Sequence, residues 1–193
     1  MPDGKIEMTT PFELPPNPDR KWGRFGEIVE GYNQEVFNER EVRASAGILF
    51  LFGFSGFVTV LNTQDFRLVQ GFALFFLIDM IIRLVFSPKY SPTMTLGRLA
   101  VYWQRPEWVS ARPKRLAWGL GFGLALTTCL LMGRLGAPVP VVLTMCGICL
   151  SMLFLEAAFG ICVGCFLQQR LSNEQPELCP GDTCNYVPGK QKT

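Results

Sequence analysis

The sequence contains no histidine among its 193 residues. This absence excludes catalysis by a histidine general base, cysteine–histidine nucleophile pairs, haem ligation by histidine and mixed cysteine–histidine zinc sites. Any reactive site must therefore be built from cysteine, carboxylates, arginine, lysine, tyrosine or backbone groups. The sequence also has no P-loop, no dinucleotide-binding fingerprint and no serine nucleophile elbow.

Dense basic clusters and a cleavable signal peptide are missing as well. The 18 lysine and arginine residues nearly balance the 16 aspartate and glutamate residues, which gives a net charge of +2. This balance argues against nucleic acid as a partner. Residues 1–20 include no apolar core of the kind that a signal peptide needs, so we expect the first membrane-spanning segment to direct insertion.

Hydrophobic residues are abundant instead, at 49% of the chain, and they are concentrated in long runs. A helix needs about 17–25 apolar residues to cross a bilayer. Runs of this length cover residues 44–61, 68–86, 116–133 and 139–167. We predict an all-α membrane protein with four transmembrane helices in a domain of residues 32–168. Residues 1–31 are rich in proline and are expected to form a flexible tail, and residues 169–193 a polar cytoplasmic tail.

The connection of residues 87–115 between the second and third spans is basic. Within it, Met94–Trp103 places apolar side chains at helical spacing, which predicts a short helix lying at the membrane interface. Residues Tyr32–Arg43, before the first span, are also expected to be helical. Lysine and arginine are concentrated before the first span and in this connection, whereas the two short loops carry one each, Arg67 and Arg134. Positive residues stay in the cytoplasm, so both termini and the central connection are predicted to be cytoplasmic.

Two of the apolar runs contain charged residues. Asp79 and Arg83 lie four residues apart on one helix face and can form an ion pair. This pair is either a structural or headgroup-level anchor or part of a site. Glu156 lies inside the fourth run and is a candidate proton relay. Alternatively, Glu156 stays protonated through desolvation, or it pairs with Arg83 or Asp79.

The sequence has seven cysteines, an odd number that disfavours a secreted disulfide framework. Cys162 and Cys165 form a C-x-x-C motif at the end of the fourth run, where we expect the cytoplasmic surface. They are the candidate dithiol, with redox, metal-binding and structural roles all open. A nearby cation would favour the thiolate, whereas a negative helix C-terminus would oppose it. Cys146 and Cys149 form a further C-x-x-C deeper in the run and are expected to be small core residues.

A second candidate pair, Cys179 and Cys184, follows in the polar tail. In one hypothesis this pair exchanges disulfides with Cys162 and Cys165 through mixed disulfides. In the other, the four thiolates bind zinc or an iron–sulfur cluster. The spacing is loose for a zinc ribbon, so the redox hypothesis is favoured, and it needs no cofactor.

Four stretches of the sequence resemble a known family. They are FNEREVRASAGILFLF (Phe37–Phe52), FFLIDMIIRLVFSPKYSPTMTLGR (Phe75–Arg98), RPEWVSARPKRLAWGLG (Arg105–Gly121) and LEAAFGICVGC (Leu155–Cys165). Together they are similar to the DUF4395 family of small bacterial integral membrane proteins, over roughly residues 32–168. The resemblance implies a helical domain in the bacterial inner membrane that ends in a C-x-x-C motif, here Cys162 and Cys165. It implies no established activity.

Three functions are compatible with these residues. The first is thiol–disulfide redox or sulfur handling through Cys162 and Cys165, with a thioredoxin-like or sulfurtransferase protein as candidate partner. The second is a transport subunit for a small sulfur species or ion, using Asp79, Arg83 and Glu156. The third is a non-catalytic membrane scaffold or assembly subunit. Enzymatic activity and oligomeric state are left open.

Overall fold

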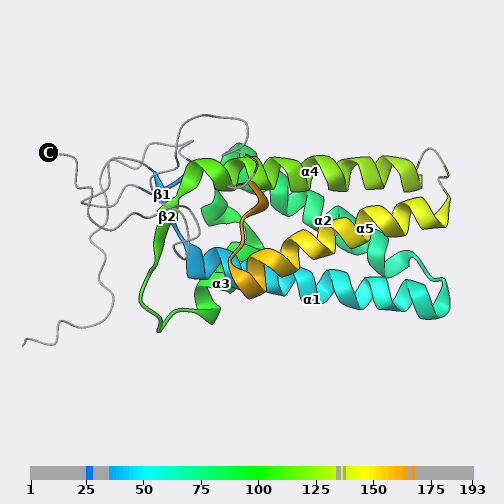
Figure 1. The fold of residues 1–193 in the computed structure, drawn as a ribbon, viewed down its shortest axis with the longest axis horizontal. Coiled ribbons are helices and arrows are strands. Elements are labelled where there is room, and N and C mark those ends of the chain that lie inside the picture. Colours follow the sequence, from blue (N-terminus) through cyan, green and yellow to red (C-terminus); the bar gives the residue numbers. More distant parts are fainter. Residues whose placement is uncertain (1–24, 28–34, 134–135, 137, 165–166, 168–193) are drawn as a thin grey trace, which may run out of the picture.

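The computed structural model describes residues 25–27, 35–133, 136, 138–164 and 167. Helices long and apolar enough to cross a membrane cover Glu39–Thr63, Arg67–Phe86, Ala111–Gly133 and Val139–Phe159. These helices lie side by side as one bundle (Figure 1). The prediction of an all-α membrane protein with four transmembrane helices is confirmed.

The helical elements follow one another closely along the chain. In order they are α1 (Glu39–Thr63), α2 (Arg67–Ile81), η1 (Ile82–Phe86), η2 (Pro88–Tyr90), α3 (Pro92–Ala100), α4 (Ala111–Gly133), α5 (Val139–Phe154) and η3 (Leu155–Phe159). The elements η1 and η3 are π-helical turns that complete the second and fourth spans, and η2 is a 3-10 turn. The chain therefore crosses the bundle four times, with α3 in the central connection.

Two short strands lie at one end of the bundle, which we call the sheet end. Strand β1 (Val36–Asn38) pairs antiparallel with β2 (Trp108–Ser110), with Phe37 opposite Val109. Helices α1 and α4 begin at this end, and α3 lies near it (Figure 1). The described segments on the predicted cytoplasmic side, namely the two strands and the starts of α1 and α4, therefore lie together at the sheet end.

The start of α1 differs from the sequence prediction. The helix predicted over Tyr32–Arg43 is wrong for Val36–Asn38, which forms β1, and α1 begins only at Glu39. Val36 and Phe37 have side chains suited to a strand, and both are buried, at 0% and 6% exposure. Asn38 then caps the helix, because its side chain accepts a hydrogen bond from the backbone N–H of Arg40.

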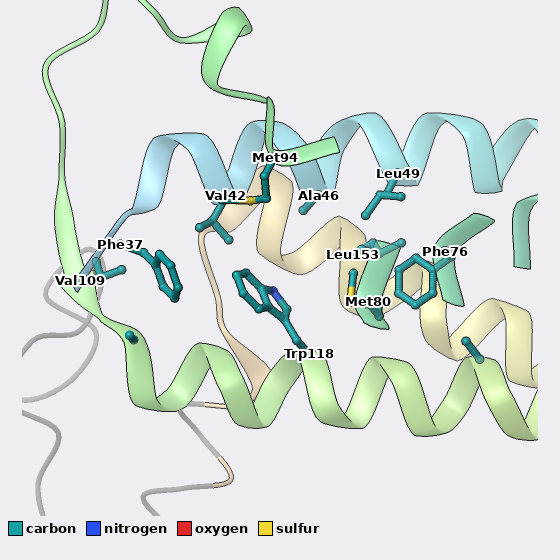
Figure 2. Packing of buried hydrophobic residues seen from close by; sticks show 12 residues of the cluster. Phe37, Val42, Ala46, Leu49, Phe76, Met80, Met94, Val109, Trp118 and Leu153 are labelled. Carbon is teal, nitrogen blue, oxygen red and sulfur yellow. The ribbon is translucent and has the colours of Figure 1, made fainter. Parts of the chain in front are cut away.

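The hydrophobic core at the sheet end joins the strands to the helices. Phe37 and Trp118 lie side by side within it (Figure 2), with ring centroids 5.4 Å apart. Phe25 packs edge-on against both rings, at 5.3 Å from each. Phe25–Glu27 falls in the range 1–31 predicted as a tail, yet Phe25 packs against the core. Residues 1–24 and 28–31 of that range lie outside the described residues.

The short helix predicted in the central connection is α3, and it packs against the start of α1. It begins and ends earlier than the predicted range Met94–Trp103. Its start is set by Ser91, which caps the helix by accepting a hydrogen bond from Met94 N. Met94 contacts Ser45, and Arg98 pairs with Glu41 at 3.2 Å. Since the numbering rises along α3 while it falls along α1, the two helices run in opposite directions.

Gly97 allows α3 and α1 to approach closely. A Cβ at this position would lie 2.6 Å from the Glu41 carbonyl oxygen and 2.9 Å from the Ser45 nitrogen. We expect Gly97→Ala to push the helices apart and to lower the midpoint of thermal unfolding, followed by circular dichroism in detergent. The control is Gly71→Ala in α2, where a Cβ meets nothing within 4 Å and alanine favours the helix by about 1 kcal/mol. Equal midpoints for the two variants would contradict the tight contact.

The fourth span ends before the cysteine motif. Because the run of residues 139–167 is longer than a bilayer requires, its helix was expected either to project beyond the apolar core or to break near Gly160 and Gly164. It ends before Gly160, which adopts a left-handed conformation with φ of 66°. The N–H groups of Gly160 and Ile161 close the last turn by donating to Glu156 O and Leu155 O. The chain can therefore change direction before it reaches Cys162.

The third span begins earlier than predicted. Its helix starts at Ala111 rather than at Leu116, so it includes Pro113 and Lys114. Proline is tolerated in the first turn of a helix, because the N–H that it lacks would have no partner within the helix there. Lys114 is thereby carried into the protein interior.

Candidate functional site

Asp79 of α2 and Arg83 of η1 form a buried ion pair at the sheet end. Arg83 Nε lies 2.8 Å from Asp79 Oδ2, and the side chains are 2% and 0% exposed. The i,i+4 spacing brings the two groups onto one face of the helix. The Arg83 guanidinium also lies over the ring of Trp118, at 4.9 Å from the centroid, which adds a cation–π contact.

Three hydroxyl groups complete the hydrogen bonds of this pair. Ser91 Oγ and Thr93 Oγ1 donate to the Asp79 carboxylate at 2.6 and 2.7 Å. The guanidinium in turn donates to the same two hydroxyls and to Ser45 Oγ of α1. The network ties α2 to α1 and to the start of α3. The members of this network satisfy one another's hydrogen bonds. A structural role for the ion pair is therefore favoured over a catalytic or ligand-binding role.

A second buried group, which we call the lysine cluster, consists of Lys114, Glu39 and Glu156. Lys114 Nζ lies 2.8 Å from Glu39 Oε2 and 2.9 Å from Glu156 Oε1. The side-chain exposures are 0% for Lys114, 1% for Glu39 and 12% for Glu156. The cluster therefore joins the first turns of α1 and α4 to the π-helical turn η3.

The lysine cluster is less completely bonded than the Asp79–Arg83 network. Within the described part of the chain, Glu39 Oε1 has no hydrogen-bond partner, and Oε2 is held by the ion pair with Lys114. Arg43 adds positive charge nearby and donates hydrogen bonds to the carbonyl oxygens of Ala157 and Ala158 on η3. A buried carboxylate with an open acceptor position can take up a proton or accept a donor.

The described part of the C-x-x-C motif contacts the first turns of α4 through Gly164. A Cβ on Gly164 would lie 2.5 Å from Pro113 O and 2.7 Å from Ala117 N, so the two backbones are in direct contact. Cys162 is 5% exposed and close enough to Lys114 for an electrostatic interaction. An ammonium group favours a thiolate. The C-terminus of the fourth span was expected to oppose the thiolate, but that helix ends at Phe159, before Cys162.

The partner of Glu156 was not anticipated. The sequence suggested Arg83 or Asp79 as partners, but Glu156 Oε1 accepts its hydrogen bond from Lys114. Glu39 and Lys114 were missed altogether, since both stand in charged segments that read as exposed. The signal available was chemical: a carboxylate inside an apolar helix requires a cation, and Lys114 lies in the connection that returns to the same end.

The remaining cysteines are only partly placed. Cys165, Cys179 and Cys184 lie outside the described residues, and so does any exchange or metal site that needs them. Among the residues that are described, no group of three or more cysteine, aspartate or glutamate side chains is arranged to bind a metal ion. Cys146 and Cys149 are half-buried on α5.

A cavity of about 50 Å³ lies between the helices beside both charged clusters. Its walls are mainly apolar, and Arg83 and Glu156 are its charged lining residues. Ile161 and Val163, the neighbours of Cys162, line it, and Cys149 of α5 lines it as well. The cavity thus adjoins the cysteine motif and extends into the bundle.

The fold and these groups define a multi-pass helical membrane protein in which a buried lysine–carboxylate cluster lies beside a C-x-x-C segment. The family model described as a domain of unknown function, DUF4395, matches residues 37–173. The chain belongs to the DUF4395 family, as the four quoted stretches predicted. Comparisons with curated proteins and with solved structures gave no match.

Proposed function

We propose that the protein carries out thiol–disulfide redox or sulfur-handling chemistry through Cys162 and Cys165. The observation that supports this best is the position of Cys162, within electrostatic range of the Lys114 ammonium and two residues before Gly164, whose backbone contacts the first turns of α4. A thiol in such surroundings is more readily converted to the nucleophilic thiolate than one in an apolar helix.

The chemical step is a disulfide exchange with a partner protein. One thiolate of the pair attacks the partner's disulfide, which gives a mixed disulfide and releases one partner thiol. The other thiolate then attacks the mixed disulfide, closes the Cys162–Cys165 bond and releases the second partner thiol. Two electrons pass to the partner, and its two thiols take up the two protons that the pair loses. A thioredoxin-like or sulfurtransferase protein has suitable chemistry for this role.

The site is assigned to the cytoplasmic side of a bacterial inner membrane. Basic residues are concentrated before α1 and between α2 and α4, and the strands β1 and β2, which belong to these two segments, lie at the sheet end. Lysine and arginine near spans stay in the cytoplasm. The proposed dithiol therefore faces cytoplasmic thiol proteins, and both termini lie on the same side.

The transport alternative has less support. Asp79 and Arg83 would have to release their mutual hydrogen bonds to bind a passing ion, and both are buried, at 0% and 2% exposure. A scaffold would give no reason for a thiol to lie within electrostatic range of a buried ammonium. The arrangement of Cys162 and Lys114 therefore favours the redox function over both alternatives.

The proposal predicts a reversible disulfide between Cys162 and Cys165. Native membranes containing the full chain are treated with oxidant or reductant, the thiols are trapped by alkylation, and the peptides are measured by mass spectrometry. We expect the pair to cycle between disulfide and dithiol, and Cys162→Ser to abolish the cycle. Cys129→Ser, on the half-buried cysteine of α4, should leave it intact. Thiols that stay reduced under every condition would rule out the redox function.

A further inference from the structure

The lysine cluster contains one more buried carboxylate than the Lys114 ammonium can neutralise. We propose that its two carboxylates, Glu39 and Glu156, form a proton-binding site. The site takes up one proton when Cys162 becomes a thiolate and releases it when Cys162 enters a disulfide. The release on disulfide formation rests on the proposed function, whereas the proton-binding site itself can be tested on the reduced chain.

The geometry couples the two carboxylates through one ammonium group. Lys114 Nζ lies 2.8 Å from Glu39 Oε2 and 2.9 Å from Glu156 Oε1, so the same cation contacts both. The side chains are at most 12% exposed, so little water screens their charges. Glu39 and Glu156 also lie within electrostatic range of each other. Two carboxylates that interact in this way bind protons as a pair rather than independently.

The charge balance of the cluster makes a proton its natural ligand. The groups that face Glu39 in the described part of the chain are Lys114 of α4, Glu156 of η3 and Arg43 of α1. With both carboxylates ionised, Lys114 leaves one negative charge, which the half-buried Arg43 balances. A thiolate at Cys162, within electrostatic range of Lys114, adds a further negative charge. Unbalanced charge is costly in the interior, so protonation of one carboxylate offsets ionisation of the thiol.

The atom best suited to hold this proton is Glu39 Oε1. It is fully buried and has no hydrogen-bond partner within the described residues. An ionised oxygen in this position has neither water nor a donor to stabilise its charge, whereas a protonated carboxyl is neutral and costs less to bury. Protonation at Oε1 also leaves Oε2 as the oxygen that faces Lys114. Glu156 is more exposed than Glu39, at 12% against 1%, and therefore stays ionised more easily.

The proton transfers balance at each step of the exchange. The Cys162 thiol loses its proton as the carboxylate pair gains one, so the charge of the interior does not change. The thiolate attacks the partner's disulfide, and one partner sulfur leaves as a thiolate. The negative charge at Cys162 disappears in the new disulfide bond, and the carboxylate pair releases its proton. The partner thiolate takes up that proton, and the electrons pass to the partner's disulfide as in the proposed function.

The first test follows the alkylation of Cys162 as the pH is varied. The reduced full chain in lipid nanodiscs is treated with iodoacetamide, and the modification of Cys162 is measured by mass spectrometry. Glu39→Gln and Glu156→Gln remove one negative charge each while keeping the side-chain shape. The matched control is Glu41→Gln, because Glu41 also lies in the first turns of α1 but pairs with Arg98, at 3.2 Å.

We expect the alkylation rate of the parent protein to rise in two steps with pH, because the thiol and the carboxylate pair share a proton. Glu39→Gln removes a negative charge that opposes the thiolate, so a single step should appear, about one pH unit below the upper step of the parent. Glu156→Gln should change the profile in the same direction, and it decides the question if Glu39→Gln does not fold. Glu41→Gln should match the parent. Parent-like profiles in both cluster variants would overturn the proton-binding site.

The second test links the proton to the disulfide. Infrared difference spectra compare the reduced and the oxidised chain at neutral pH, because a protonated carboxyl and a carboxylate absorb at different frequencies. The parent should show a carboxyl band in the reduced state that disappears on oxidation, and Glu39→Gln should lack it. An equal band in both states would overturn the coupling. If the parent forms no disulfide, the proposed function fails, whereas the alkylation profile of the reduced chain still decides the proton-binding site.

Discussion

Replacing Asp79 by alanine is expected to lower the free energy of unfolding by about 3–5 kcal/mol, which is the usual cost of removing one partner of a buried ion pair. Arg83 would remain at 2% exposure without its carboxylate. Ser91 and Thr93 would lose the acceptor for their short hydrogen bonds of 2.6 and 2.7 Å. Unfolding in detergent, titrated with sodium dodecyl sulfate and followed by circular dichroism, measures the loss.

The matched control for this variant is Asp65→Ala. Asp65 also pairs with an arginine, but Arg67 Nε is 4.0 Å away and both side chains are largely exposed. Exposed pairs contribute about 0–1 kcal/mol. The apolar double variant Asp79→Leu/Arg83→Met removes both charges and should regain most of the stability lost by Asp79→Ala. If Asp79→Ala cost no more than Asp65→Ala, the network would not be a structural anchor, and the transport alternative for Asp79 and Arg83 would gain support.

The parts of the structure that sequence could predict are the local ones. The apolar runs determined four spans, because crossing a bilayer requires a minimum length of apolar helix. The spacing of Asp79 and Arg83 placed both on one face of a single helix, so their pairing needed no knowledge of the fold. Gly160 marked a place where the last helix could end, because glycine reaches the left-handed conformation without a Cβ penalty.

The parts that escaped prediction depend on contacts between distant segments. Strand β1 exists only because Trp108–Ser110 returns beside it, and two three-residue strands carry almost no periodic signal. The partner of Glu156 lies 42 residues away in the sequence, in a segment whose charges suggested a loop. Lys114 is buried because two carboxylates from other helices surround it. The sequence around a single lysine does not reveal that carboxylates from distant segments neutralise its charge.

Replacing Lys114 by methionine is expected to have the other large effect, on stability and on thiol chemistry together. Glu39 and Glu156 would lose the cation that lies 2.8 and 2.9 Å from their oxygens, and removing one partner from a buried pair costs about 3–5 kcal/mol. Cys162 would also lose the ammonium that favours its thiolate. We expect a lower unfolding free energy and a slower reaction of Cys162 with a small disulfide reagent.

A second variant separates these two effects. In Glu39→Gln/Lys114→Met/Glu156→Gln no charge of the lysine cluster remains, so folding should largely recover, as it does when buried ion pairs are replaced as a unit. The thiol has no ammonium in this variant, so its reaction should stay slow at neutral pH and should quicken only at higher pH, where the thiolate forms without help. Recovery of folding together with a parent-like reaction rate would show that the lysine cluster is only structural. Recovered folding with a shifted pH profile would mean that one buried ammonium both holds three helices together and activates the thiol beside it.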